Sequence, residues 1–152
     1  MRIAVASDHA GFTLKKGILS LLEKRGIDHK DFGCFSSERV DYVDFAVQAA
    51  EKVRSGEYDR AILICGTGLG MAMVANKFPG IRATPCCDAF TAEMSRKHND
   101  SNCLTLGGRI LPLDEAEEIT TIWLETEFEE GRHRERLEKI VQLEKNLAGI
   151  PE

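Results

Sequence analysis

No run of apolar residues in this sequence approaches the ~20 that a membrane-spanning helix requires. The opening residues, MRIAVASDHAG, also lack the apolar length of a secretory signal peptide, since a charged aspartate already stands at position 8. Both absences argue against the common routes to a membrane or to secretion. We therefore expect a cytoplasmic protein with no membrane partner.

The cysteines lack the spacing of a metal site or a disulfide framework. There are five, an odd number, and none belongs to a CxxC pair or to a Cys/His pattern typical of zinc ligands. Cations are in deficit as well, because 20 lysines and arginines face 25 aspartates and glutamates, for a net charge of −5. Nucleic acids would repel such a chain at long range. The sequence thus predicts reduced thiols, no bound metal and no nucleic-acid partner.

Short runs rich in β-branched residues alternate with helical patterns along the 152 residues. Strands are expected at about 2–7, 27–32, 61–64, 81–84 and 103–106. Helical patterns follow each of them, around 14–22, 44–54, 69–77, 88–98 and 113–123. Strands joined by helices run parallel. We expect one α/β domain, 1–152, built as a Rossmann-like or flavodoxin-like three-layer sandwich with a five-stranded parallel sheet and helices on both faces.

The C-terminal segment, 131–147, differs in character from the rest. It opens on the cationic run GRHRER and continues as a helix whose apolar stripe consists of Leu137, Ile140, Val141 and Leu147. We expect this extension helix to dock on a partner subunit, with packing on its own domain as the alternative. Arg132 and Arg136 share a helix face and can grip one phosphate together; the alternative is a solvated charged face.

The stretch AILICGTGLGMAMVANK, residues 61–77, is the centre of the predicted fold. A buried strand runs into a loop with glycines at 66, 68 and 70, and a helix follows. Free N–H groups at such a helix start favour a phosphate or an oxyanion. A thiol beside a helix N-terminus ionises more readily than a free one, so Cys65 is a candidate base. The alternative is that Cys65 is a small apolar packing residue.

Three other kinds of glycine loop do not fit this stretch. A nucleotide P-loop needs GxxxxGK[ST], and no lysine-serine or lysine-threonine pair follows these glycines. A dinucleotide fingerprint follows the first strand, whereas this loop follows the third. A cysteine phosphatase needs an arginine where Met71 stands. The loop is therefore not assigned to nucleotide binding or phosphatase chemistry.

Further polar residues follow or flank the predicted strands. Because ligands of open α/β sheets bind at the carboxyl ends of the strands, we expect Asp8, His9, His98 and Asn99 to gather near Cys65. His98 has the alternative of capping a helix, and Arg109 is compatible with a ligand contact or a plain surface charge. The remaining cysteines and the larger aromatic residues are expected in the interior: Cys34, Cys86, Cys87, Cys103, Phe12, Phe45 and Trp123.

Several long motifs, in order, resemble the family of type B ribose-5-phosphate isomerases, which also contains the galactose-6-phosphate isomerase subunits. They are SDHAG at 7–11, DFG at 31–33, CGTGLGMAMVANK from 65, RKHNDSNCLTLGGR at 96–109 and GRHRER from 131. The resemblance extends from residue 1 to about 147. It implies interconversion of an aldose phosphate and a ketose phosphate through an enediolate, without a metal or an organic cofactor.

The resemblance also implies roles for individual residues. Cys65 would be the base that moves the proton between C1 and C2, and His98 would help to open the sugar ring. The Thr67 hydroxyl and the loop backbone would stabilise the enediolate; the loop residues are Gly66, Gly68, Leu69 and Gly70. Sugar hydroxyls and phosphate would contact the remaining set: Asp8, His9, Asn99, Arg109, Arg132 and Arg136. The two C-terminal arginines would come from a neighbouring subunit of a homo-oligomer, a dimer or a tetramer.

Two positions depart from the family pattern. One branch of the family has a glutamate base where Met71 stands, and a thioether accepts no proton, so Cys65 is the one candidate base of the loop. Val43 replaces an expected proline, beside Tyr42, which is a candidate to line the pocket. The expected substrate is ribose 5-phosphate, with ribulose 5-phosphate as product. The alternatives are a six-carbon phosphate, of allose or galactose, and a non-catalytic module that binds a phosphorylated ligand.

Overall fold

The computed structural model describes residues 1–149, so the last three residues of the expected domain lie outside the described part. Its elements, in chain order, are β1 (Arg2–Ser7), α1 (Phe12–Lys24), β2 (Asp28–Asp31), α2 (Tyr42–Arg54), β3 (Arg60–Cys65), α3 (Leu69–Ala75), β4 (Ala83–Pro85), α4 (Ala89–Asn99), β5 (Cys103–Gly107), α5 (Leu113–Glu125) and α6 (Arg132–Leu147). All paired strands are parallel, and their order in the sheet is β2-β1-β3-β5-β4.

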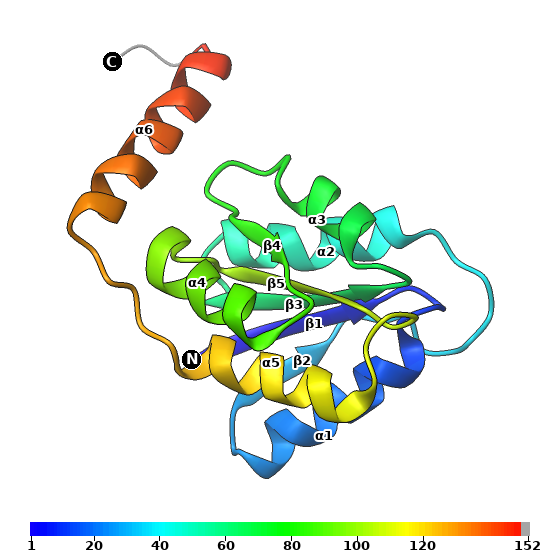
Figure 1. Ribbon diagram of the computed structural model, residues 1–152. Coiled ribbons are helices and arrows are strands. Elements are labelled where there is room, and N and C mark those ends of the chain that lie inside the picture. The colour runs from blue at the N-terminus through cyan, green and yellow to red at the C-terminus, as the bar shows by residue number, and fades with distance from the viewer. Residues whose placement is uncertain (150–152) are drawn as a thin grey trace.

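Helices cover both faces of this sheet, as Figure 1 shows. The helices α1, α4 and α5 lie on one face, and α2 and α3 lie on the other. The predicted doubly wound three-layer fold is therefore confirmed. The chain turns outward in opposite directions from β1 and β3, which are neighbours in the sheet. Ligands of open α/β sheets bind at such a switch point, outside the carboxyl ends of the strands.

The two faces of the sheet carry side chains of different size. In β1, Ile3 and Val5 belong to the apolar cluster under α1, α4 and α5, whereas Ala4 and Ala6 belong to the cluster under α2 and α3. The separation follows from the two-residue period of a strand. On the α2 face, three alanines of the helix meet the small side chains of the strand: Ala46, Ala49 and Ala50, all fully buried. Small residues on both partners let α2 approach the sheet closely.

Two element boundaries differ from those predicted. The helix α2 begins at Tyr42, before the expected Asp44, because the Asp41 carboxylate caps it by accepting the Val43 N–H. The strand β4 begins only at Ala83. The backbone amides of the two preceding residues are committed elsewhere, to the Phe78 carbonyl and to the Asn102 side chain, so 81–82 do not join the ladder.

The expected interior is only partly correct. Trp123 is fully buried, and three of the four cysteines expected to pack are buried as well: Cys34, Cys86 and Cys103. Cys87 is exposed, because it stands just before the Asp88 cap of α4, on the surface. Phe12, the first residue of α1, is only partly buried. Phe45, in the first turn of α2, is partly buried and packs against the apolar cluster under α2 and α3. The predictions for Cys87 and Phe12 were wrong, and the prediction for Phe45 was correct in part.

The last helix, α6, projects away from the sandwich, at the upper left of Figure 1. Most of its apolar stripe lies in solvent, with exposed fractions of 44% at Ile140, 41% at Val141 and 80% at Leu147, whereas Leu137 is partly buried. Leu143 on the same helix is 56% exposed. One contact with the body of the domain is the Glu144 carboxylate, which accepts the Gly80 N–H. Across residues 1–149, no helix is both long and apolar enough to cross a membrane.

The alanine layer under α2 generates a stability prediction. Ala49→Leu adds volume where helix and strand backbones are close, and we expect it to lower the free energy of unfolding by about 1–3 kcal/mol. Gln48→Leu is the matched control, because residue 48 is exposed on the same helix; it should change the free energy by less than about 0.5 kcal/mol. Denaturant unfolding at one fixed protein concentration measures both. Equal effects of the two changes would show that the layer is not tightly packed.

Candidate active site

Three loops meet at the carboxyl edge of the sheet, after β1, β3 and β5. The Gly108 N–H donates to the Cys65 carbonyl over 2.7 Å, and the Arg109 N–H donates to the Gly66 carbonyl over 3.0 Å. The loop after β1 packs equally closely, since a Cβ on Gly11 would lie 2.4 Å from the Ile64 carbonyl oxygen. Only glycine tolerates such an approach. The sequence pattern AG…GTGLG…GGR thus builds one compact backbone platform.

The Cys65 sulfur lies at the end of β3, on this platform. The Gly68 N–H donates to the sulfur over 3.2 Å, from a backbone with φ of +79°. The residue is 5% exposed and is a member of the apolar cluster under α2 and α3, as the packing alternative for Cys65 also expects. Burial raises the pKa of the Cys86 and Cys103 thiols, as fits their packing role.

One cavity borders the glycine loop, and a second lies beside the loop after β1. The first, of about 250 Å³, is lined by Thr67, Leu69, Pro85, Cys86, Cys87, Gly107, Ile110 and Leu111. The second, of about 530 Å³, is lined by Asp8, His9, Arg39, Val40, Asp41 and Tyr42. Cys65 lines neither cavity, and its side chain is nearly covered.

The larger cavity is shaped by hydrogen bonds to the loop after β1. The Asp8 carboxylate accepts the N–H groups of Ala10 and Gly11, at 2.9 and 3.0 Å, which fixes its orientation. His9 Nδ1 accepts the Val40 N–H over 3.3 Å, so a neutral His9 carries its proton on Nε2. Nε2 is then a donor for a ligand.

Tyr42 and Arg109 border the glycine loop itself. A Cβ on Gly70 would lie 2.8 Å from the Tyr42 ring, and one on Gly66 would lie 3.4 Å from Arg109 Cδ. Thr67 and Leu69 are exposed, and the Thr67 hydroxyl accepts the Leu69 N–H over 3.3 Å. The structure thus brings together nine of the predicted site residues: Asp8, His9, Cys65, Gly66, Thr67, Gly68, Leu69, Gly70 and Arg109.

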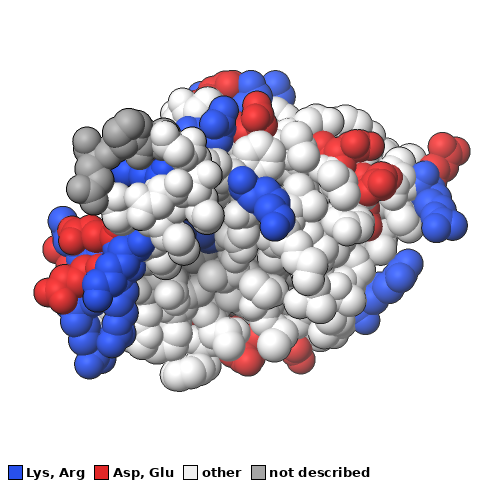
Figure 2. Space-filling view, turned by 90° about the horizontal axis from the view of Figure 1, so that it is seen from above, with Lys and Arg blue, Asp and Glu red and all other residues white. Residues whose placement is uncertain are grey.

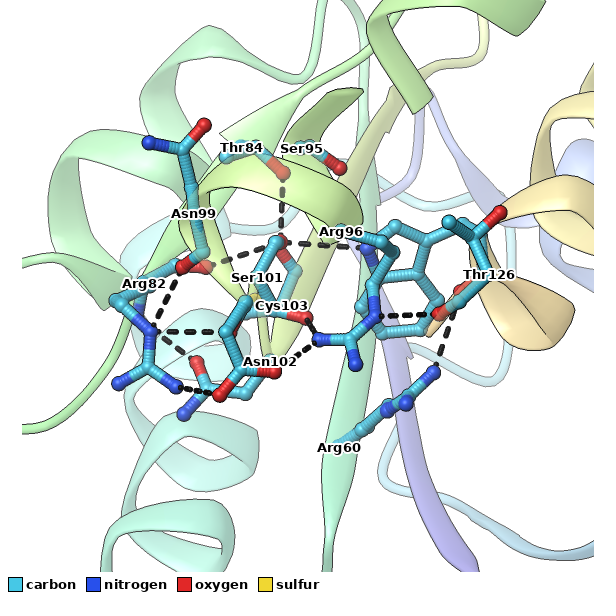
Figure 3. Close-up of polar contacts among 12 residues, drawn as sticks. Arg60, Arg82, Thr84, Ser95, Arg96, Asn99, Ser101, Asn102, Cys103 and Thr126 are labelled. Carbon is cyan, nitrogen blue, oxygen red and sulfur yellow. Dashed lines mark hydrogen bonds and ion pairs between the residues drawn. The ribbon is translucent and has the colours of Figure 1, made fainter. Parts of the chain in front are cut away.

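His98 and Asn99 lie at the opposite edge of the sheet, so the expectation that they gather near Cys65 in one chain was wrong. A helix between two parallel strands runs back along them, and α4 therefore ends where β5 begins. The Asn99 carbonyl accepts from Arg82, just before β4, as Figure 3 shows. Along the five residues of β5, roughly 16 Å separate the two edges.

At this amino edge, His98 meets two residues that sequence reasoning did not single out. Its ring stacks on that of His133, with centroids 4.1 Å apart, and both Nε2 atoms lie near Glu129 Oε2, at 3.8 and 3.5 Å. Burial lowers the pKa of His133, as do His98, Arg132 and Arg136, while Glu129 opposes them. The signal in the sequence was the histidine between the arginines of GRHRER.

A buried arginine holds this edge together. Arg96 is 5% exposed and donates to Asp100 Oδ1, the Ser101 carbonyl and the Thr126 carbonyl, over 2.7, 2.6 and 3.2 Å (Figure 3). It thereby ties the end of α4 to the segment that precedes α6. Burial, together with the nearby Arg96, lowers the pKa of Arg60 to about 10.

Arg132 and Arg136 lie near the start of α6, close to His133. Both are exposed, and neither has an ion-pair partner within residues 1–149. In the view from above, charged side chains lie along both sides and one cation lies near the centre, with uncharged surface between them (Figure 2). A hollow of about 370 Å³ on this face is lined by Val43, Val47, Met73, Val74, Lys77 and Phe78.

Comparisons with known proteins agree with this architecture. The family model described as Ribose/Galactose Isomerase matches residues 3–140. Ribose-5-phosphate isomerase B of Escherichia coli is 47% identical over 94% of this chain and 96% of its own length. The solved structure of Clostridium thermocellum ribose-5-phosphate isomerase B superimposes with a TM-score of 0.95, at 51% identity, over 97% of this chain and 99% of its own. D-erythrulose-4-phosphate isomerase of Pectobacterium atrosepticum is 38% identical over 92% of this chain and 93% of its own length.

The doubly wound sheet, with a thiol and a glycine loop at its switch point, together with these matches, defines a sugar-phosphate isomerase. The chain belongs to the ribose/galactose isomerase family.

The close packing of the platform generates a second stability prediction. Gly68→Ala forces a side chain into φ of +79° and within 3.1 Å of the Leu106 backbone, so we expect a loss well above the ~1–2 kcal/mol of left-handed strain alone. Gly56→Ala is matched, with φ of +76° and no atom within 4 Å. Denaturant midpoints compare the two. A Gly68→Ala protein no less stable than Gly56→Ala would contradict the proposed close approach.

Proposed function

We propose that this protein interconverts ribose 5-phosphate and ribulose 5-phosphate through an enediolate. The observation that carries the proposal is the Cys65 sulfur, which accepts the Gly68 N–H at the carboxyl end of β3, in a loop whose Thr67 and Leu69 line a cavity. The name of the Escherichia coli relative supports the choice of substrate.

The chemistry requires one base and one oxyanion site. The Cys65 thiolate takes the proton from C2 of the open-chain aldose. The electrons of the broken C2–H bond form the C1–C2 double bond of an enediolate, and the C1 oxygen takes the negative charge. Loop N–H groups and the Thr67 hydroxyl stabilise this oxygen. The thiol then returns the proton to C1 while the proton of the C2 hydroxyl passes to the C1 oxygen, which gives the ketose. A positioned base contributes about 10²–10⁴ in rate and an oxyanion donor about 10²–10³.

The surroundings of Cys65 support its role as the base. Met71, at the position where the other branch of the family has glutamate, is fully buried and accepts no proton. The thiolate must stay reduced, which fits five free cysteines within the described residues and the cytoplasm as the compartment.

We assign the phosphate end to His9 and Arg109 of the same chain, with Asp8 and Tyr42 beside the sugar hydroxyls. Arg109 lies over Gly66, and His9 presents Nε2 to the larger cavity. Substrate would extend from Cys65 towards these residues. The exposed edges of the platform leave room for further groups from outside the chain.

We infer that a second copy of the chain supplies those groups. His98, Asn99, Arg132 and Arg136 lie at the amino edge, roughly 16 Å of strand away from Cys65, and no arrangement of one rigid domain brings them to the thiol. A twofold dimer that sets one edge against the other completes two sites at once. His98 of the partner subunit then opens the sugar ring, and the partner's Arg132 and Arg136 bind phosphate.

Uncovered apolar surface supports this dimer. The stripe of α6, with Ile140, Val141 and Leu143, is exposed in one chain, as is Met73 on the outer face of α3, at 69%. Monomeric proteins rarely leave such surfaces in water. Docking of α6 on the partner would cover the stripe and carry Arg132 and Arg136 to the second carboxyl edge. Dimers can pair further into a tetramer through the remaining apolar face.

The base assignment predicts the behaviour of Cys65→Ala. We expect kcat on ribose 5-phosphate to fall by about 10²–10⁴, with a smaller change in KM, because the base acts in the transition state. Cys103→Ala, at the far end of β5, is the control and should keep kcat. A panel of five-carbon and six-carbon phosphates, including allose and galactose 6-phosphate, should give the highest kcat/KM for ribose 5-phosphate. Full turnover by Cys65→Ala would remove Cys65 from the role of base.

The shared site predicts complementation between two inactive variants. Cys65→Ala and His98→Asn proteins, mixed in equal amounts and allowed to exchange subunits, should regain about a quarter of wild-type activity. Half of randomly paired dimers are mixed, and each mixed dimer has one site with both residues intact. Light scattering follows the assembly. An active monomer, or no recovery after proven exchange, would contradict the proposal.

A further inference from the structure

Three potential metal ligands converge where α4 ends and α6 begins. They are His98, Glu129 and His133, which we call the histidine cluster. The Nε2 atoms of the two histidines lie 3.8 and 3.5 Å from Glu129 Oε2. One ligand atom from each of the three residues lies within 4.8 Å of the other two. The sequence did not predict this site, because its ligands do not follow a known spacing.

Among the three residues, His133 gives the evidence for a ligand. It is 5% exposed, and its Nε2 atom is buried without a hydrogen-bond partner within residues 1–149. Buried polar atoms in native proteins are nearly always satisfied. The Glu129 carboxylate lies close to this atom without a well-directed hydrogen bond. An ion between the two would satisfy the nitrogen and the carboxylate together.

Backbone contacts hold the cluster in place. The Glu129 N–H donates to the Lys97 carbonyl over 3.0 Å, which fixes the glutamate beside the last turn of α4. The His133 N–H donates to the Glu130 carbonyl over 3.1 Å, in the first turn of α6. Arg96 adds its bond to the Thr126 carbonyl. The three ligands therefore come from two segments already joined to each other.

We propose that the histidine cluster binds a divalent transition-metal ion, with Zn²⁺ as the preferred ion, and leaves one coordination position open. Two imidazoles and a carboxylate are ligands that zinc accepts, whereas Mg²⁺ and Ca²⁺ require oxygen. Bonds of about 2.0–2.2 Å in a tetrahedron place ligand atoms roughly 3.3 Å apart. The observed 3.5 and 3.8 Å need to shorten by only a few tenths of an ångström.

One movement is required for this coordination. The two rings are stacked at an interplanar angle of 10°, so their lone pairs run nearly parallel and one ring must tilt towards the ion. The His98 side chain is 38% exposed at the end of a helix, and it has the space to turn. His133 stays fixed by its burial. The positive charges of Arg132 and Arg136 weaken the binding of a cation, and the Glu129 carboxylate opposes them.

Ion binding would inhibit the isomerase. This consequence rests on the proposed function, in which His98 of the partner subunit exchanges a proton with the sugar ring. A metal bond at His98 Nε2 occupies the lone pair that this exchange uses. Zinc would then lower turnover reversibly, and a chelator would restore it. The binding site itself does not depend on that assignment.

Calorimetric titration of the metal-free, full-length protein with ZnCl₂ tests the site. The Cys87→Ser variant is the parent, because the one thiol exposed within the described residues would otherwise compete. We expect one ion per chain. Glu129→Gln, which keeps the shape of an exposed side chain, should weaken binding by about tenfold or more, since even the loss of a supporting group costs 10–100-fold. Glu127→Gln is the matched control, exposed two residues away, and should bind as the parent does.

Absorption spectra with CoCl₂ identify the ligands independently. Nitrogen and oxygen ligands should give visible bands without the intense thiolate-to-cobalt charge-transfer absorption. Such a thiolate band, the absence of saturable binding, or equal affinities of Glu129→Gln and Glu127→Gln would each overturn the proposal.

Activity measurements separate the site from its consequence. Inhibition of turnover with the same midpoint as zinc binding is the expected result. Binding without inhibition would overturn the inhibitory consequence and leave the site standing. A metal-free protein without isomerase activity would refute the proposed function, and the titration would still decide whether the cluster binds zinc.

Discussion

The packing of three strand-end loops against one another is the constraint on which the site depends. Backbone meets backbone there: a Cβ on Gly108 would lie 2.5 Å from the Ala10 carbonyl oxygen, and the Gly108 N–H bonds to the Cys65 carbonyl. With no side chains to fill the junction, amide groups of the glycine loop face the end of β3, and one of them donates to the Cys65 sulfur. The thiol in this place is therefore nearly shielded from water and has one backbone donor.

The amino edge is organised by a charged group instead of glycines. Arg96 is buried, yet its guanidinium contacts a carboxylate and two carbonyls, so the charge is compensated where it lies. Those contacts hold the chain after α5 against the end of α4, and Trp123 adds a hydrogen bond from Nε1 to the Ser101 hydroxyl (Figure 3). The result is a rigid base from which α6 leaves the domain. The direction of α6, and hence of its arginines, follows from this edge.

Local pattern was enough to predict the elements, because each carries its own signal. The β-rich run of β1, the cap Asp88, and the glycines that follow α1 and α2 are readable one segment at a time, whereas the Asp41 cap was missed and the start of α2 with it. A rule of topology would have placed His98 correctly, because a helix that connects two parallel strands ends at the amino edge of the sheet. His98 is close in sequence to the start of β5, whereas the prediction placed it near the end of that strand. The Glu129–His98 contact had no local signal, since it depends on how the chain folds back from α5 to α4.

The separation of the two edges also restricts the assembly that can complete a site. A head-to-tail contact that set the amino edge of one chain on the carboxyl edge of the next would leave one unfilled edge at each end, and would grow unless it closed into a ring. A twofold contact sets the amino edge of each chain against the carboxyl edge of the other, so both sites of the dimer are completed and no edge is left unfilled. In the twofold dimer that we propose, the same rotation would place the apolar stripe of each α6 on the other chain. One helix would then carry both the residues that complete the site and the apolar residues that need cover.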